Sequence, residues 1–164
     1  MGICLGGVIA TAIALLLEEI GIHNVTIISW DSVITNKDLI EIRNKNSLLT
    51  VKQALNQAYS GASATLIARI NESIESSIKL LNAIFLKQLT YTNIVLFKTL
   101  LVEDKIKILQ PEYEYICSLI YNNFDMIQPN LTKINKIELA DAKHGGFLSQ
   151  VELVAKNIIR IKNN

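Results

Sequence analysis

The chain has 164 residues, half of them hydrophobic, which is long and apolar enough to bury the core of one domain. Its formal net charge is +1 and its basic residues are scattered, which excludes an electrostatic basis for binding nucleic acid or an anionic membrane. The two cysteines, Cys4 and Cys117, lie far apart without metal-ligand spacing, so we expect no disulfide and no metal site, and a reducing cytoplasm.

The first predicted element is a mostly apolar helix over residues 7–20, with Gly21 as its C-cap. The apolar run from Gly2 to Leu17 has the length of a signal peptide, but no basic segment precedes it, and two glutamates continue the helix. It is also short for a membrane span. We therefore expect neither a targeting segment nor a membrane partner.

A short β-branched segment, Val25–Trp30, predicts a buried strand that ends at Asp31. A glycine-rich turn followed by a helix and a strand is half of a parallel α/β unit. The sequence therefore predicts the α/β class with a mostly parallel sheet.

Residues 36–91 differ in composition, since strand patterns disappear and Asn, Ser, Gln and Lys become common. Helices are predicted at Val51–Tyr59, Ala62–Leu81 and Ala83–Leu89. The middle helix carries an apolar stripe at spacings of three and four residues, made of Ile67, Ile70, Ile74, Ile78 and Leu81. A helical block between strands predicts a lid inserted into an α/β core.

The remaining elements are two strands, each followed by a helix. A strand is expected at Asn93–Lys98, a short helix around Glu112–Tyr121, a last strand at Ile134–Ala140 and a terminal helix at Val151–Ile161. Because no repeat or linker interrupts the pattern, we expect residues 1–164 to form a single domain.

The segment Gly2–Gly7 (GICLGG) fits the nucleophile elbow G-x-S-x-G, with cysteine in place of serine. The turn from strand to helix in this motif is so tight that glycines must flank the nucleophile. It would set Cys4 at a helix N-terminus, where the dipole favours a thiolate and a developing oxyanion. The backbone N–H of Leu5 is then the expected oxyanion donor.

Two other interpretations of this segment stay open. A free cysteine such as Cys4 is often a small buried hydrophobic residue. The glycines could also form a dinucleotide-binding turn, with Asp31, 24 residues after Gly7 (31 − 7), accepting from a ribose, although the spacing G-x-x-x-G-G departs from G-x-G-x-x-G.

His144 is the candidate base, because it follows the last predicted strand and precedes the terminal helix. In an α/β-hydrolase the loop after the last strand overhangs the elbow, and the chain order is nucleophile, acid, base. The candidate acid is Asp31, 27 residues after Cys4 (31 − 4), at the end of the neighbouring strand. Asp104, just past the next strand, is the alternative acid.

Two further residues are set aside. Asp141 lies too close in sequence to the histidine that it would orient, and His23 falls in a loop at the opposite end of the sheet.

Three segments, GICLGGVIA from Gly2, LLLEEIG from Leu15 and IISWDS from Ile27, resemble the thioesterase domains of non-ribosomal peptide and polyketide synthases. NIVLFK from Asn93 is similar to the next core strand of that family, and KHGGFL from Lys143 is similar to its histidine-containing stretch. The resemblance covers most of the chain in order, and the helical block falls where the family has its lid.

The resemblance implies a partial α/β-hydrolase fold and an acyl hydrolase with the triad Cys4, Asp31 and His144. The enzyme would release an acyl or peptidyl chain from a carrier-protein thioester. It implies no cofactor, because the substrate arrives on phosphopantetheine, and its partners would be an acyl or peptidyl carrier protein or synthase modules.

Two departures from the family are notable. Cysteine replaces the usual serine, although a Cys–His pair also supports acyl-enzyme chemistry. The three residues before Cys4 are also short for a central strand, so a separate chain supplying the missing N-terminal strands is an expected partner.

The rival functions are a cysteine acyltransferase or dienelactone-type hydrolase, a nucleotide-binding α/β domain of the ubiquitin-activating kind, and a catalytically inactive fragment.

Overall fold

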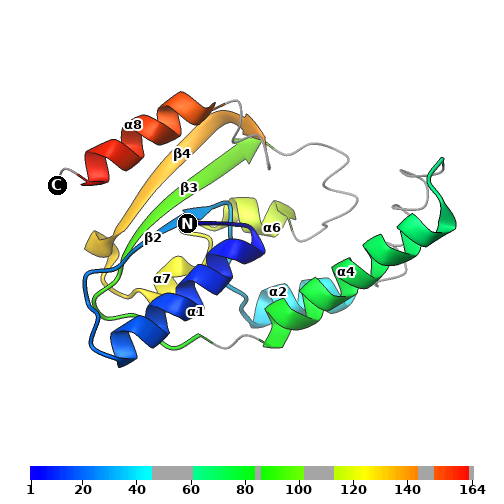
Figure 1. The fold of residues 1–164 in the computed structure, drawn as a ribbon, viewed down its shortest axis with the longest axis horizontal. Coiled ribbons are helices and arrows are strands. Elements are labelled where there is room, and N and C mark those ends of the chain that lie inside the picture. The colour runs from blue at the N-terminus through cyan, green and yellow to red at the C-terminus, as the bar shows by residue number, and fades with distance from the viewer. Residues whose placement is uncertain (46–60, 84–85, 102–112, 144–149, 163–164) are drawn as a thin grey trace.

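The computed structural model describes residues 1–45, 61–83, 86–101, 113–143 and 150–162. Its centre is an all-parallel sheet of four strands in the order β1-β2-β3-β4 (Figure 1). The strands are β1 (Gly2–Ile3), β2 (Thr26–Trp30), β3 (Asn93–Leu101) and β4 (Ile134–Lys143). The prediction of an α/β domain with a parallel sheet is therefore confirmed.

Helices follow each strand in turn. They are α1 (Leu5–Glu19), α2 (Lys37–Lys45), α4 (Ala64–Ala83), α6 (Tyr113–Ser118), α7 (Phe124–Ile127) and α8 (Val151–Lys162), with a 3-10 turn η1 (Leu131–Lys133) before β4. Figure 1 shows α1 and α8 on opposite sides of the sheet. Successive parallel strands need such crossover connections.

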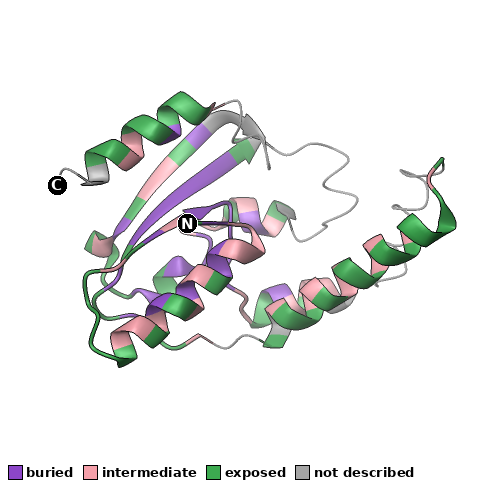
Figure 2. Ribbon diagram, viewed as in Figure 1, coloured by how far each residue is buried: buried purple, intermediate pink, exposed green. Residues whose placement is uncertain are grey.

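The two faces of the sheet form two apolar clusters. On the α1 face, Ile94 and Leu96 of β3 pack with Ile27 of β2. On the other face, Val95 and Phe97 pack with residues of β4 and with Val154 of α8. A strand whose successive side chains are all buried is typical of a sheet covered on both faces, and β3 is buried along most of its length in Figure 2.

The predicted helix and strand positions are largely confirmed, with differences at their ends. The C-cap of α1 is Ile20, one residue before the predicted Gly21. Gly21 follows it with φ +84°, and its N–H donates to the carbonyl of Glu18 at 3.0 Å, as is usual for a glycine just after a helix. Strands β3 and β4 each continue three residues beyond their predicted ends, because Thr99–Leu101 pair with Leu139–Lys143 across a register shift.

In the predicted lid, α4 matches the expected middle helix, and its stripe of Ile67, Ile70, Ile74, Ile78 and Leu81 is half-buried. The predicted helix Ala83–Leu89 is wrong at residues 86–89, which are not helical. The reason is tertiary: the Leu89 N–H donates to the Ile127 carbonyl at 2.6 Å, and the Leu89 side chain is buried in the core. Val51–Tyr59 lies outside the described residues.

Within the described ranges, no helix combines the length and apolar character needed to cross a membrane.

Candidate active site

The backbone makes a sharp turn at Cys4, between the end of β1 and the start of α1. Cys4 has φ 49° and ψ −119°, a conformation that costs a residue with a side chain about 1–3 kcal/mol. Two hydrogen bonds hold this turn: the Cys4 N–H donates to the Trp30 carbonyl at 3.0 Å, and the Gly7 N–H donates to the Cys4 carbonyl at 3.1 Å. A strained residue between a strand and a helix is the geometry of a nucleophile elbow.

The glycines around this turn differ in what they permit. A Cβ on Gly2 would overlap the backbone of Gly6 and Gly7, and a Cβ on Gly7 would overlap the side chain of Ser32. A Cβ on Gly6 would meet nothing within 4 Å. The prediction that glycine is required on both sides of Cys4 therefore holds for Gly2, but on the helical side the required glycine is Gly7, one position later.

Leu5 is the first residue of α1, so its backbone N–H has no acceptor within the helix. The half-buried Cys4 precedes it at the positive end of the helix dipole. The arrangement is suited to holding negative charge on the sulfur or on an oxygen bound close to it.

Asp31 leaves β2 beside Cys4. Ile3 pairs with Trp30 in the parallel register, so the next residue of each strand, Cys4 and Asp31, emerges at the same level of the same sheet edge. Asp31 also has φ 49°, and its N–H donates to the Phe97 carbonyl at 2.8 Å. Cys4 and Asp31 therefore lie at the same edge of the sheet, as expected from the sequence.

Asp31 is 7% exposed, and its carboxylate accepts hydrogen bonds from Thr99 of β3. The Thr99 N–H donates to Oδ1 at 3.2 Å, and the Thr99 hydroxyl donates to Oδ2. Because Thr99 lies on the β4 side of Asp31, the carboxylate is directed away from β1 and toward the strand that His144 follows.

Lys98 is a buried cation beside this carboxylate, and it is a feature that the sequence analysis missed. Its side chain is 4% exposed, and its Nζ donates to the Cys117 carbonyl at 3.0 Å and to the Leu119 carbonyl. Burial lowers the pKa of the Lys98 ammonium, and the charges of Cys117, Glu138 and, least of all, Asp31 oppose this shift. A lysine in the apolar run NIVLFK was a signal that this strand carries a buried charge.

Two consecutive asparagines support the loop that follows Asp31. Asn122 and Asn123 are buried with φ 51° and 63°. Their side-chain amides donate to the carbonyls of Ser32 and Ile34 at 3.1 and 2.9 Å. The segment after β2 is therefore held by hydrogen bonds from two residues that are not part of the sheet. No sequence motif predicts these hydrogen bonds.

His144 and the alternative acid Asp104 lie outside the described residues. The strand that leads to His144 is described to its end. Ile137 is level with Trp30 through Phe97, and Lys143 pairs with Leu101, four residues beyond Phe97 (101 − 97), which is about 13 Å at ~3.3 Å per residue. Contact between the imidazole and the Cys4 thiol therefore requires the chain after Lys143 to turn back toward the elbow.

Neither a scan against models of protein families nor a search among curated proteins finds a match to this chain.

Proposed function

We propose that this chain carries the catalytic elbow of a partial α/β-hydrolase and cleaves acyl thioesters, with a carrier-protein phosphopantetheine thioester as its substrate class. The observation that carries the proposal is the strained backbone of Cys4, φ 49° and ψ −119°, at the one residue where the motif requires a nucleophile. The neighbouring Asp31 at the same level of the sheet supports it.

In the proposed mechanism, His144 takes the proton of Cys4, and the thiolate attacks the thioester carbonyl carbon. The resulting oxyanion accepts a hydrogen bond from the Leu5 N–H. Its collapse breaks the carbon–sulfur bond to pantetheine, whose thiol leaves with the proton from the His144 imidazolium. Water, deprotonated by His144, then attacks the acyl-cysteine and regenerates the Cys4 thiol.

Asp31 would act as the acid that orients His144 and stabilises the imidazolium. The hydrogen bonds from Thr99 keep its carboxylate fixed, and its direction toward the β4 side of the sheet suits a base that arrives from there. Asp104 stays the alternative acid.

The lid is part of the same proposal. The isoleucine stripe of α4 is only half-buried, so apolar surface is available to line an acyl channel. Amphipathic helices over an α/β core commonly serve this purpose in lipid-processing sites.

A nucleotide-binding function is less well supported. In that alternative Asp31 would accept hydrogen bonds from a ribose. The spacing of Gly2, Gly6 and Gly7, G-x-x-x-G-G, also departs from the G-x-G-x-x-G of a dinucleotide-binding turn.

The test is acylation of the full chain by an acyl-N-acetylcysteamine thioester, followed by intact mass and peptide mapping. We expect one acyl group on Cys4, no adduct in Cys4→Ala, and an unchanged adduct in the matched control Cys117→Ala. Acylation on Cys117, or acylation that survives Cys4→Ala, would contradict the proposal. Absence of any adduct in the wild-type chain would favour the catalytically inactive alternative.

A further inference from the structure

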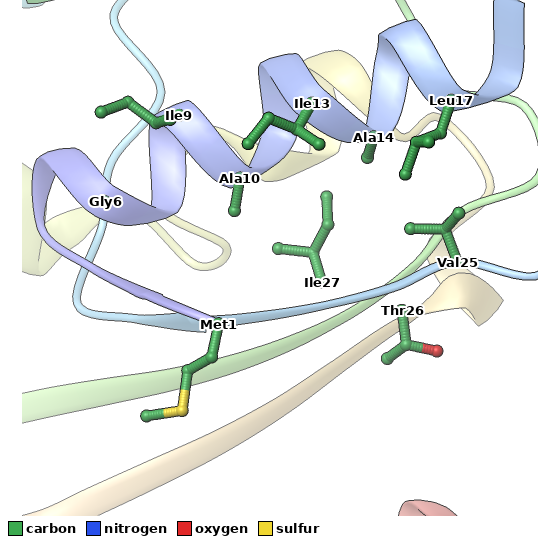
Figure 3. A pocket seen from close by; sticks show the side chains of 10 residues that line it. All are labelled: Met1, Gly6, Ile9, Ala10, Ile13, Ala14, Leu17, Val25, Thr26 and Ile27. Carbon is green, nitrogen blue, oxygen red and sulfur yellow. The ribbon is translucent and has the colours of Figure 1, made fainter.

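The pocket between α1 and β2 is apolar. Its volume is about 310 Å³, and Figure 3 shows Ile13 of α1 above Ile27 of β2 within it. None of the ten residues that line this pocket has a titratable side chain. A titratable pair that the proposed mechanism does not use lies elsewhere, in β3 and α6, where Lys98 bonds to the backbone of Cys117.

Lys98 ties β3 to α6 through the hydrogen bonds of one buried amine. Its Nζ donates to the backbone carbonyl of Cys117 at 3.0 Å and to that of Leu119. Lys98 is 4% exposed, so its amine has little room to leave these acceptors. The amine is therefore held against the last turn of α6, which is the turn that carries the Cys117 thiol.

The Cys117 thiol belongs to the same residue as the carbonyl that accepts from Lys98. Only a few covalent bonds separate the carbonyl oxygen and Sγ of one residue, so rotation of the two side chains can bring Sγ and Nζ together. Of the ionisable side chains that act on the Lys98 ammonium, that of Cys117 acts most strongly. Because Coulomb energy falls with distance, this is the order expected if the sulfur is the nearest of them.

Both groups have the properties that a bond between them requires. Cys117 is half-buried, so a molecule as small as hydrogen peroxide can reach it. A neighbouring ammonium favours a thiolate, which is the form of cysteine that oxidants attack. Burial lowers the pKa of the Lys98 ammonium, and an amine that loses its proton more easily is a better nucleophile at neutral pH.

We propose that Cys117 and Lys98 form a covalent sulfur–nitrogen bond, a sulfenamide, when the protein meets a peroxide. First, the Cys117 sulfur attacks one oxygen of hydrogen peroxide and the O–O bond breaks, which oxidises the thiol to a sulfenic acid and releases water. The lone pair of the neutral Nζ then attacks this sulfur, the S–O bond breaks, and the hydroxide leaves as water with a proton from the nitrogen. One thiol, one amine and one peroxide thus give one sulfenamide and two waters.

The bond would fasten α6 covalently to β3. The segment that follows α6 carries Asn122 and Asn123, whose amides hold the loop after Asp31, so the bond would also stiffen that loop. A dithiol reverses it: the two thiols of one dithiothreitol molecule become a disulfide, and the Cys117 thiol and the Lys98 amine return. The inference is independent of the proposed thioesterase activity.

The test treats the full wild-type chain and its Cys4→Ala variant with hydrogen peroxide, followed by intact mass and peptide mapping. The variant is needed because a disulfide between Cys4 and Cys117 would lower the mass by the same two hydrogen atoms. In both proteins we expect a loss of two hydrogen atoms and one linked pair of peptides, containing Cys117 and Lys98. Dithiothreitol should restore the original mass.

Two lysines provide matched variants in the Cys4→Ala background. Lys98→Arg keeps the positive charge but has no amine that can lose its proton, and it should abolish the cross-link. Lys136→Arg makes the same exchange on the neighbouring strand and should keep the cross-link. Mapping without a lysine substitution identifies the linked nitrogen directly, so the result does not depend on how Lys98→Arg folds.

Several outcomes would overturn the inference. Oxidation of Cys117 to a sulfinic acid without a cross-link would show that the amine does not reach the sulfur. A bond from Cys117 to another lysine or to a backbone nitrogen would contradict the pairing, as would a cross-link that survives in Lys98→Arg. A Cys117 thiol left intact by peroxide that fully oxidises dissolved cysteine would show that the oxidant does not reach it.

Discussion

The carboxylates of Asp31 and Glu18 accept hydrogen bonds at opposite ends of the same sheet. At the carboxyl edge, Asp31 accepts from the N–H and hydroxyl of Thr99. At the amino edge, Glu18 of α1 accepts from the three successive N–H groups of Thr90, Tyr91 and Thr92, at 2.7 to 2.8 Å, and from the Thr92 hydroxyl at 2.6 Å. Asp31 and Glu18 therefore make the same kind of interaction: each carboxylate accepts hydrogen bonds from backbone N–H groups, of β3 for Asp31 and of the segment that leads up to β3 for Glu18.

The two ends differ in backbone strain. Glu18 lies in a regular helix, whereas Asp31 and its neighbour Cys4 both have φ 49°. Strain of this kind persists only where the surrounding structure enforces it, and it concentrates at functional sites. The comparison teaches that the hydrogen-bond pattern alone does not mark a site, and that the backbone conformation separates the proposed catalytic carboxylate from the structural one.

The largest expected effect comes from exchanging each carboxylate for its amide. Asp31→Asn should lower kcat/KM for thioester hydrolysis about a thousandfold or more, because an amide cannot stabilise the imidazolium. Glu18→Gln should change it less than about twofold, since that residue lies at the other end of the sheet. Steady-state hydrolysis of the acyl-N-acetylcysteamine thioester measures both.

Equal activity in Asp31→Asn and the wild type would remove Asp31 from the proposed triad. The alternative acid Asp104 would then be tested by the same substitution.

The second prediction separates two adjacent glycines at the elbow. Gly7→Ala should lower the free energy of unfolding by about 3 kcal/mol, because the added methyl overlaps the buried Ser32 side chain. Gly6→Ala should be neutral or raise it by up to ~1 kcal/mol, since the position is helical and open. Urea denaturation of the two variants measures the difference, and similar losses in both would show that the turn is not packed as described.

The third prediction compares the adjacent glutamates at the amino edge. Glu18→Ala should lower the free energy of unfolding by about 1–2 kcal/mol, because the N–H of the buried Thr92 loses its acceptor, whereas the exposed Thr90 and Tyr91 can bond to water. Glu19→Ala removes only an exposed ion pair with Lys87 and should cost at most ~0.5 kcal/mol. Urea denaturation of both variants measures the difference. A loss of the same size in both would show that the hydrogen bonds to Glu18 contribute no more to stability than an exposed ion pair does.

The contribution of Glu18 should also depend on pH. Partial burial raises the pKa of this carboxyl, but the hydrogen bonds from Thr90, Tyr91 and Thr92 outweigh burial and hold it below its usual 4.5. As the pH falls, the unfolded chain therefore binds a proton at this carboxyl before the folded chain does. The stabilisation by Glu18 is complete above the usual pKa of 4.5 and is lost as the pH falls through the lowered pKa of the folded state. We expect the difference in unfolding free energy between wild type and Glu18→Gln to shrink between about pH 5 and pH 3.

The smallest predicted effect is a gain in stability at the proposed nucleophile. Cys4→Gly should raise the free energy of unfolding by about 1 kcal/mol, because glycine adopts φ 49° without the steric cost of a side chain. The same variant should form no acyl adduct, so stability and function would move in opposite directions. A loss of stability would mean that the Cys4 side chain contributes more through packing than its backbone costs.

The sequence predicts the α/β class and most elements because their signals are local. The β-branched runs at Val25–Trp30 and Asn93–Lys98 and the apolar helix after Cys4 need no knowledge of their neighbours. The ends of β3 and β4 could not be predicted, since the last three residues of each strand are held there by their pairing with each other, which is a long-range contact. The segment 86–89 was assigned to a helix for the same reason: the Leu89 contacts with the core are long-range.

For the candidate site, the sequence predicts the turn at Cys4 from the spacing of the glycines. It also predicts that Asp31 lies at the same sheet edge as Cys4, because one helix and one strand separate the two residues. It does not predict Thr99 and Lys98, whose roles follow from side-chain direction and register at the sheet edge. Nor does it distinguish Gly6 from Gly7, which depends on the position of Ser32.

The buried ammonium of Lys98 gives the molecule an unusual response to base. Burial lowers its pKa below the usual 10.5, so between the two values the unfolded chain holds a proton that the folded chain releases. Over that interval the stability contributed by Lys98 increases with pH, whereas a lysine whose pKa is raised by an ion pair loses its contribution only above the usual lysine pKa. In alkaline solution just below the usual lysine pKa, the packing of α6 against β3 should therefore become more stable, because the uncharged amine can still donate to the Cys117 carbonyl.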